Sequence, residues 1–176
     1  LKTARKKLKS QKLNFITFVL FFSFLFLSFY LVAAQNVIKI ENINMYYPSY
    51  YVKVNLYNIY QTSVLIDTKN QNRTIYVEIL EVKDINALLE NIKSDLEDFY
   101  EKKYSIFVNQ KSSVKNYPVY IFGYTFPNYE TEYKNLKYYI GIKPGRFLGV
   151  YCMGPSKEFD ELYKDFINLV ESLEVK

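Results

Sequence analysis

LKYYIGIKPGRFLGVYCM, residues 136–153, is the stretch that decides the fold, because it joins two strand-like segments through a tight turn. The segments 136–143 and 147–153 are rich in the aromatic and β-branched residues that favour strands. Between them, Pro144 fixes its own φ angle and Gly145 can adopt a positive one, a combination typical of a reverse turn. The sequence therefore predicts an antiparallel hairpin here.

A helix is predicted directly after this hairpin. Gly154 and Pro155 interrupt the strand pattern, and Ser156 belongs to the residue types that cap helix N-termini. The residues that follow have apolar members every three or four positions, as on the buried stripe of an amphipathic helix: Phe159, Leu162, Tyr163, Phe166, Leu169, Val170 and Leu173. We expect Ser156 to cap this helix.

The chain before the hairpin supplies a second helix and further strands. Asp84 is a good N-cap, and apolar residues recur at helical spacing over residues 85–100. Gly123 indicates a bulge or a close backbone approach within its strand. The strand candidates are residues 43–48, 50–54, 63–67, 74–82, 104–109 and 117–126. Hairpin-like spacings argue against a doubly wound sheet, so we predict an α+β fold, a central antiparallel β-sheet flanked by helices.

Residues 13–34 form an uncharged apolar run that would extend about 33 Å as a helix, enough to cross a bilayer. Six basic residues and no acidic one precede it, which predicts a cytoplasmic N-terminus and an extracytoplasmic domain. The run is longer than a signal peptide needs, which favours an uncleaved anchor. Cleavage after Ala34 is the alternative and would secrete the domain. The predicted division is a basic cytoplasmic segment (1–12), a transmembrane signal-anchor (13–34), a linker (35–41) and an extracytoplasmic domain (42–176).

Charge and composition exclude several classes of function. The formal charge is +5, but the chain after Ala34 carries 17 basic and 18 acidic residues, a net charge of −1, which argues against nucleic-acid binding. The single cysteine, Cys152, rules out an internal disulfide framework and lies in an apolar strand pattern typical of a buried thiol. The chain has no histidine, the commonest general base and zinc ligand. We expect no cofactor and no metal.

Three further segments resemble one known family. Residues 42–49 (NINMYYPS) are similar to its strand that runs into a Tyr-Pro-Ser turn, and residues 115–120 (KNYPVY) to the start of its central strand. The block from Phe159 to Val175 resembles its closing helix. The domain therefore resembles the PsbP-like family, the extrinsic photosystem II protein and its relatives. The resemblance covers residues 42–175 and implies an α/β/α arrangement around an antiparallel sheet. It implies no site residue here, because the photosynthetic members use histidines around metals and this chain has none.

Two features are candidates for a site. Asn72, in Asn72-Arg73-Thr74, is the only N-glycosylation acceptor and falls in a predicted loop. Of the 19 tyrosines, 18 follow the apolar run, and the adjacent pairs Tyr50-Tyr51 and Tyr138-Tyr139 must point to opposite faces of their strands. These four side chains are core residues if helices cover both faces. They form a binding surface for protein or saccharide if one face is partly open.

Other polar clusters are predicted to be solvated. Asp67, Asn70 and Asn72 resemble a calcium loop only faintly, because the glycine and terminal glutamate of that motif are missing, so we predict a turn. No nucleotide-binding or nucleophile motif is present.

The sequence favours a non-catalytic, membrane-anchored binding or accessory module that contacts a membrane complex or envelope component. A small-ligand-binding domain with a pocket between sheet and helix is the alternative, followed by a hydrolase that uses carboxylates.

Overall fold

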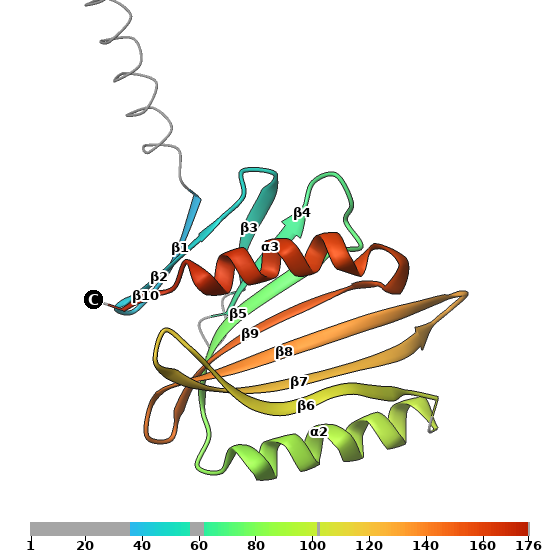
Figure 1. The fold of residues 1–176 in the computed structure, drawn as a ribbon. Coiled ribbons are helices and arrows are strands. Elements are labelled where there is room, and N and C mark those ends of the chain that lie inside the picture. The colour runs from blue at the N-terminus through green and yellow to red at the C-terminus, as the bar shows by residue number, and fades with distance from the viewer. Residues whose placement is uncertain (1–35, 57–61, 102, 176) are drawn as a thin grey trace, which may run out of the picture. The chain divides into compact units, whose positions relative to one another are not determined.

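A computed structural model describes residues 36–56, 62–101 and 103–175 of the chain (Figure 1). The predicted cytoplasmic segment (1–12) and signal-anchor (13–34) lie outside the described residues. Within the described ranges, no helix is both long enough and apolar enough to cross a membrane.

Seven antiparallel strands form the main sheet of the described chain, in the order β3-β4-β5-β9-β8-β7-β6. The hairpin predicted from residues 136–153 is confirmed as β8 and β9 near the centre of this sheet, and Gly145 has a φ of 72° in its turn. The bounds of the strands are Tyr51–Leu56 (β3), Thr62–Asp67 (β4), Thr74–Glu81 (β5), Ser105–Val114 (β6), Tyr117–Asn128 (β7), Thr131–Lys143 (β8) and Arg146–Pro155 (β9).

A smaller antiparallel sheet contains β1 (Asn36–Ile40), β2 (Ile43–Tyr47) and the short β10 (Glu174–Val175). The prediction of a linker over residues 35–41 is thereby corrected, because most of that segment is β1. Ile38 and Ile40 alternate into the core, where they are 1% and 5% exposed. The two buried isoleucines flank the exposed Lys39, which is the alternation of a half-buried strand.

Two helices cover opposite faces of the main sheet, which confirms the predicted α+β fold. α3 (Phe159–Glu171) and the small sheet pack on the face that contains Ile121, whereas α2 (Ile85–Tyr100) packs on the face that contains Phe122. Adjacent strand residues point to opposite faces, so these two neighbours belong to different layers of the core. Figure 1 shows α3 running across the sheet near β9 and α2 lying on the side of β6 and β7.

Of the two helix N-caps predicted from the sequence, one is confirmed. Asp84 caps α2 as predicted, since its Oδ1 accepts the backbone N–H of Asn86 at 2.9 Å. The prediction that Ser156 caps the last helix is wrong. A single turn of 3₁₀ helix, η1 (Ser156–Glu158), precedes α3, and the Ser156 hydroxyl donates to Glu132 Oε1 at 2.8 Å instead. The side chain has a better partner on the neighbouring hairpin than in its own turn.

The strand β6 extends five residues beyond the predicted segment 104–109, to Val114. It lies at the edge of the main sheet and most of its side chains are exposed, so the buried alternation that identifies a strand is absent from its second half. Lys115 and Asn116 connect it to β7 with φ angles of 46° and 70°, which is the conformation of a tight two-residue hairpin turn.

Candidate binding groove and the polar network beside it

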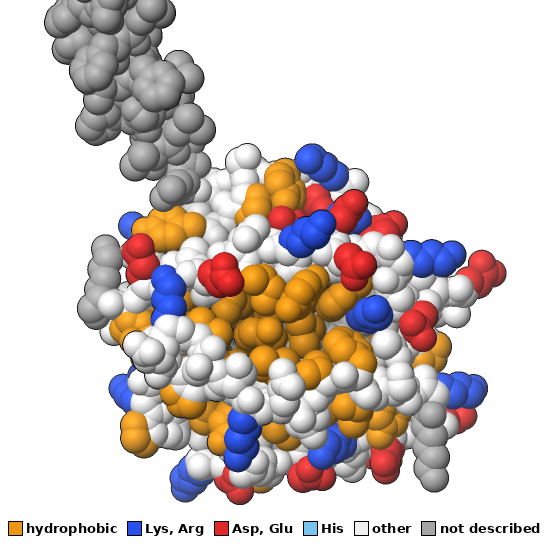
Figure 2. Space-filling view, in the orientation of Figure 1, with side chains coloured by type: hydrophobic (Ala, Val, Ile, Leu, Met, Phe, Trp, Pro, Cys, Tyr) orange, Lys and Arg blue, Asp and Glu red, His pale blue; other side chains and the backbone are white. Residues whose placement is uncertain are grey.

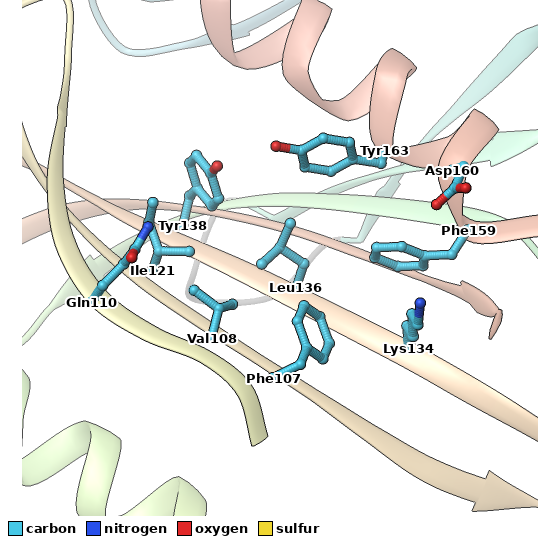
Figure 3. Close-up of a pocket in the computed structure, with 10 residues that line it drawn as sticks. All are labelled: Phe107, Val108, Gln110, Ile121, Lys134, Leu136, Tyr138, Phe159, Asp160 and Tyr163. Carbon is cyan, nitrogen blue, oxygen red and sulfur yellow. The ribbon is translucent and has the colours of Figure 1, made fainter. Parts of the chain in front are cut away.

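An apolar groove of about 300 Å³ lies between α3 and the β6–β8 part of the main sheet. The sheet is wider than α3, so this part of its face has no helix over it. Figure 2 shows apolar side chains gathered at the centre of the same face. The residues that line the groove are Phe107, Val108 and Gln110 of β6, Ile121 of β7, Lys134, Leu136 and Tyr138 of β8, and Phe159, Asp160 and Tyr163 of α3 (Figure 3).

The floor of the groove belongs to the hydrophobic core. Ile121, Leu136 and Phe159 are 8%, 4% and 5% exposed. The ring of Tyr138 meets the ring of Phe166 edge-on, with centroids 4.9 Å apart, which fixes it against α3. The groove therefore has a rigid base that the packing of the sheet holds in shape.

The outer wall is exposed and depends on Gly123. Phe107 is 46% exposed and Tyr163 is 41% exposed, so the two rings face each other across an open channel (Figure 3). A register shift between Ile106 and Val108 places Phe107 at a bulge, and its ring lies over Gly123. A Cβ atom on Gly123 would be only 2.6 Å from Phe107 Cζ. Of the bulge or close backbone approach predicted at Gly123, the structure has a bulge in the partner strand opposite it, and the atoms that approach Gly123 belong to side chains of β6.

Few polar groups surround the apolar floor. Lys134 Nζ lies 5.9 Å from the ring centroid of Phe107 and 5.7 Å from that of Phe159, which keeps one cation at the rim. Asp160 is exposed in the first turn of α3. Burial raises the pKa of Tyr138 to about 12, and the neighbouring Tyr163 adds to that shift, so Tyr138 keeps its proton at neutral pH. The groove can bind an apolar group and offer it a few hydrogen-bonding partners.

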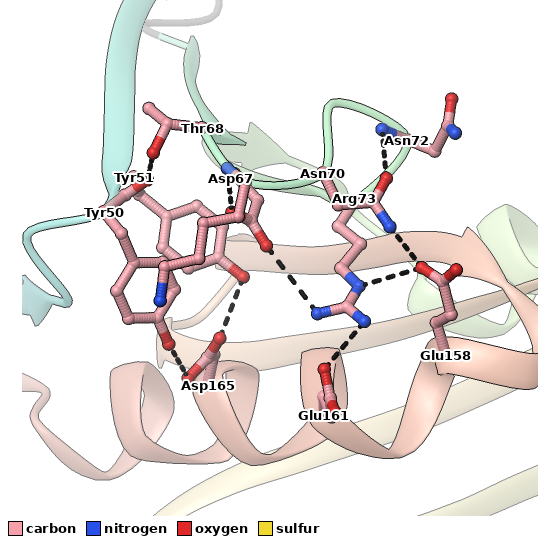
Figure 4. A network of polar contacts seen from close by, with 11 residues as sticks. Tyr50, Tyr51, Asp67, Thr68, Asn70, Asn72, Arg73, Glu158, Glu161 and Asp165 are labelled. Atoms are coloured by element: carbon pink, nitrogen blue, oxygen red, sulfur yellow. Dashed lines mark hydrogen bonds and ion pairs between the residues drawn. The ribbon is translucent and has the colours of Figure 1, made fainter.

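A charged network around Arg73 fixes the start of α3 on the sheet (Figure 4). Arg73 Nη2 is 2.8 Å from Glu161 Oε2, its Nε is 3.3 Å from Glu158 Oε2, and its Nη1 is 3.7 Å from Asp67 Oδ2. Asp67 is 1% exposed, so Arg73 supplies the positive charge that this buried carboxylate needs. Asn70 also donates to Glu158. The turn between β4 and β5 is thus joined to the wall of the groove.

Two tyrosines extend this network along α3. The hydroxyls of Tyr50 and Tyr51 donate to Asp165 at 2.6 and 3.1 Å. The pKa of both hydroxyls is raised well above its usual range, mainly by burial and secondly by the neighbouring Asp165 carboxylate. Lys69 Nζ lies 4.5 Å from the Tyr50 ring centroid. All of these groups already have partners within the domain, so the network positions α3 and leaves the groove as the open site.

Three solved structures share this arrangement at low sequence identity. The solution structure of cyanobacterial PsbP (CyanoP) from Synechocystis sp. PCC 6803 aligns with a TM-score of 0.59 at 12% identity, covering 81% of this chain and 92% of that one. The domain has a PsbP-like fold. LpqN of Mycobacterium tuberculosis, described as involved in cell envelope biogenesis, aligns with a TM-score of 0.60 at 10% identity over 81% of this chain and 86% of its own.

The Ran-binding protein Mog1p of Saccharomyces cerevisiae is the third, with a TM-score of 0.52 at 14% identity over 81% of this chain and 96% of that one. No family model matches the chain, and no curated protein matches it in sequence. At these identities the comparisons establish the PsbP-like fold alone.

The PsbP-like domain buries three of the four tyrosines that were candidates for a binding surface. Tyr51, Tyr138 and Tyr139 are 3%, 8% and 1% exposed, and Tyr50 is half-buried against Asp165. Tyr138 faces α3, whereas Tyr139 faces the α2 layer, where its ring lies 5.4 Å from that of Tyr151. Tyr51 and Tyr138 contact α3, and Tyr139 lies in the α2 layer, so these three rings are core residues, and Tyr138 alone also lines the groove.

The remaining candidates lie apart from the groove. Asn72 is exposed in the turn between β4 and β5, and its glycosylation stays a prediction. The turn predicted at Asp67 is confirmed, because Asp67 Oδ1 accepts the backbone N–H of Lys69 at 2.8 Å. Among the residues that the structure describes, no group of histidine, cysteine or acidic side chains is arranged to hold a metal ion. Cys152 is fully buried, and burial raises the pKa of its thiol.

Sequence reasoning offered a pocket between sheet and helix only as an alternative, and of its residues it named Tyr138 alone as a candidate, because they come from four separate elements. Two local features of the sequence pointed to the groove: Gly123 within a strand, and the apolar run Ile106, Phe107 and Val108. A glycine in a strand indicates that something approaches closely, and here that is the Phe107 ring. The sequence alone gives no pairing between β6 and β7 that would connect them.

Proposed function

We propose that this protein is a non-catalytic binding or accessory module, held at the outer face of a membrane by residues 13–34. The observation that carries the proposal is the open apolar groove between α3 and β6–β8. Phe107 and Tyr163 are partly exposed beside a well-packed apolar floor. A contiguous exposed apolar surface of this kind is typical of an interaction site. A partner surface or segment is the natural cover.

The predicted anchor belongs to this proposal, and the fold supports it. A tethered domain meets membrane-bound partners at raised effective concentration, so a shallow groove can suffice where a free protein would need a large interface. The domain shares its fold with LpqN, whose structure is described as that of a protein of cell envelope biogenesis, and with the Ran-binding protein Mog1p. Mog1p is thus a binding protein with this fold, and we propose a binding role for this chain as well.

The proposal is tested by purifying the full chain from its native membrane in mild detergent and identifying what co-purifies. The matched pair of variants is Tyr163→Arg, which places a charge in the groove, and Phe99→Arg, which places one on α2, where Phe99 is 80% exposed. We expect a stoichiometric partner with the unmodified chain and with Phe99→Arg, and its loss with Tyr163→Arg. Purification of the unmodified chain alone, or equal recovery with both variants, would contradict the proposal.

A small apolar ligand is the second candidate, and one observation favours it. The groove volume of about 300 Å³ is at the lower end of the range for small-molecule pockets, and it lies between sheet and helix as that alternative predicts. Native mass spectrometry of the detergent-released chain distinguishes the two candidates. A bound small molecule that is lost in Tyr163→Arg favours a ligand-binding domain, and a protein partner favours the accessory module.

A further inference from the structure

The strand β6 is a free edge of the main sheet. It is the last strand in the sheet order, ten residues long, with eight of those residues exposed. A strand at the edge of a sheet presents unpaired backbone N–H and C=O groups that can pair with another chain. The bulge at Phe107 interrupts this edge near its start, so the regular part from Val108 to Val114 is the part that can pair with another chain.

The register identifies which residues present these groups. Val114 and Tyr117 flank a two-residue turn, which makes them a hydrogen-bonded pair. Hydrogen-bonded and non-hydrogen-bonded pairs then alternate along an antiparallel ladder. Asn109, Lys111 and Ser113 therefore direct their backbone N–H and C=O groups away from β7, toward the free edge.

The groove is continuous with this edge. The side chains of Val108 and Gln110 line the groove, whereas Lys111 points to the opposite face, where its Nζ lies 5.1 Å from the Tyr120 ring centroid. A strand added beside β6 would lie about 4.8 Å away and alternate its side chains in the same way. Every second side chain of the added strand would lie on the groove side of the sheet, against Val108 and Gln110, and the others would lie on the face of Lys111.

Charge indicates what kind of chain fits. The hairpin of β6 and β7 (residues 105–128) contains two lysines, Lys111 and Lys115, and no acidic residue, whereas the rest of the chain after Ala34 has 15 basic and 18 acidic residues. The hairpin is thus the cationic part of an otherwise acidic domain, and Lys111 is its exposed cation, because Lys115 Nζ donates to the Leu173 carbonyl at 2.8 Å. Pairing of β6 with a second copy of itself would bring two such hairpins together, which like charges disfavour. An acidic partner is complementary.

We propose that β6 binds an acidic, extended polypeptide segment as an additional strand, with apolar side chains at alternate positions against the β6 wall of the groove and acidic ones on the face of Lys111. This inference rests on the proposed function, for which it names the class of partner. Backbone pairing supplies affinity, and the groove and Lys111 supply register and specificity.

The test uses the full chain in lipid nanodiscs and capped peptides matched in length to β6. The first peptide alternates Glu with Val, the second alternates Lys with Val, and the third has the composition of the first without the alternation. We expect binding by fluorescence anisotropy for the first peptide only. N-methylation of alternate amides should abolish binding for the set that faces β6 and leave it for the set that faces away.

Two pairs of variants locate the site. Asn109→Pro removes an outward N–H and should weaken binding about tenfold or more, whereas Asn109→Ala keeps that N–H and should bind normally. Lys111→Glu should weaken binding about tenfold, more at low salt than at high salt, and Lys111→Arg should not. A thermal unfolding curve for each variant checks that it is folded.

The outcomes separate this inference from the proposed function. Equal binding of the acidic and basic peptides, or indifference to the N-methyl pattern, would overturn strand addition. Binding of the chain to vesicles of anionic lipid through Lys111, with no peptide bound, would overturn it in favour of a membrane surface. If Tyr163→Arg loses the native partner while Asn109→Pro and Lys111→Glu keep it, strand addition fails and the accessory module stands.

Discussion

At the residue scale, the absence of one side chain shapes the groove. Gly123 lies under the Phe107 ring, and a Cβ atom at this position would also be 2.7 Å from Val108 Cγ1. Phe107 is partly exposed and can swing away from the sheet, but Val108 is a β-branched residue within the strand and has less freedom. The glycine thus allows two apolar side chains of β6 to lie on the sheet.

We predict that Gly123→Ala destabilises the domain by about 1–2 kcal/mol, the lower part of the range for an overpacked site, because the displaced Phe107 ring can relax into solvent. It should also weaken binding in the groove, since Phe107 forms its outer wall. Urea unfolding measures the first effect and the peptide assay the second. Gly141→Ala is the control, because its new Cβ atom would be 3.1 Å from the nearest atom, a side-chain carbon of Pro118, and lie outside the groove. Equal costs at the two glycines would refute this account of Gly123.

At the scale of elements, α3 is held by the turn between β4 and β5. Arg73, 14% exposed at its side chain, reaches two carboxylates of the helix region and the buried Asp67. The pairs with Glu158 and Glu161 are partly solvated and contribute little each. The energetic weight lies with Asp67, because an unpaired carboxylate in the core is costly.

We predict that Arg73→Met destabilises the domain by about 2–3 kcal/mol, since it leaves the Asp67 carboxylate buried with only its backbone donor. Arg73→Lys keeps the charge without the planar fork and should cost less. The measurement is the free energy of unfolding in urea. The control is Lys93→Met, which removes the cation of the ion pair between Lys93 and the exposed Glu90 on α2. A cost below about 0.5 kcal/mol for Arg73→Met would show that Asp67 does not depend on Arg73.

Some elements of this fold could be predicted from the sequence and others could not. The β8–β9 hairpin, the stripe of α3 and the Asp84 cap were predictable because local chemistry and tertiary packing demand the same residues there. The second half of β6 carries no buried alternation, and β1 looked like a linker because only Ile38 and Ile40 mark its inner face. Ser156 failed as a cap because Glu132, distant in sequence, competes for its hydroxyl. The Arg73 network depends on side chains from three elements, which no local pattern reveals.

At the scale of the whole domain, buried tyrosines on both faces of the sheet couple stability to high pH. Burial raises the pKa of Tyr124 and Tyr138 to about 12, and also raises that of Tyr139 and Tyr151. Unfolded tyrosines titrate near pH 10. The native state therefore binds these protons more tightly, so their contribution to stability is complete below about pH 10 and is lost as pH rises toward 12.

We predict that the free energy of unfolding falls between about pH 10 and pH 12, and that phenolate absorbance rises in part with the unfolding transition. Tyr138→Phe should reduce the slope, because it removes one of the shifted groups. Tyr129→Phe should leave it unchanged, because Tyr129 is fully exposed at the turn between β7 and β8. Stability that stays constant or increases over this range would contradict the burial of the tyrosine hydroxyls.

The distribution of charge connects the domain to its predicted place in the cell. The basic residues that precede residues 13–34 account for the positive formal charge, and the PsbP-like domain itself is nearly neutral with a cationic β6–β7 hairpin. The anchor stays a prediction, as does the absence of catalysis. These two predictions belong to the proposal of a binding module that uses the groove and the β6 edge.

The central claim is that the groove between α3 and β6 is the surface that meets a partner. The most direct test is photo-crosslinking in the native membrane, with a photoreactive phenylalanine analogue at Tyr163 in the groove or at Phe99 on α2. We predict a discrete crosslinked protein from Tyr163 and none from Phe99. Crosslinks of equal intensity from both positions, or from Phe99 alone, would contradict the claim and move the binding surface away from the groove.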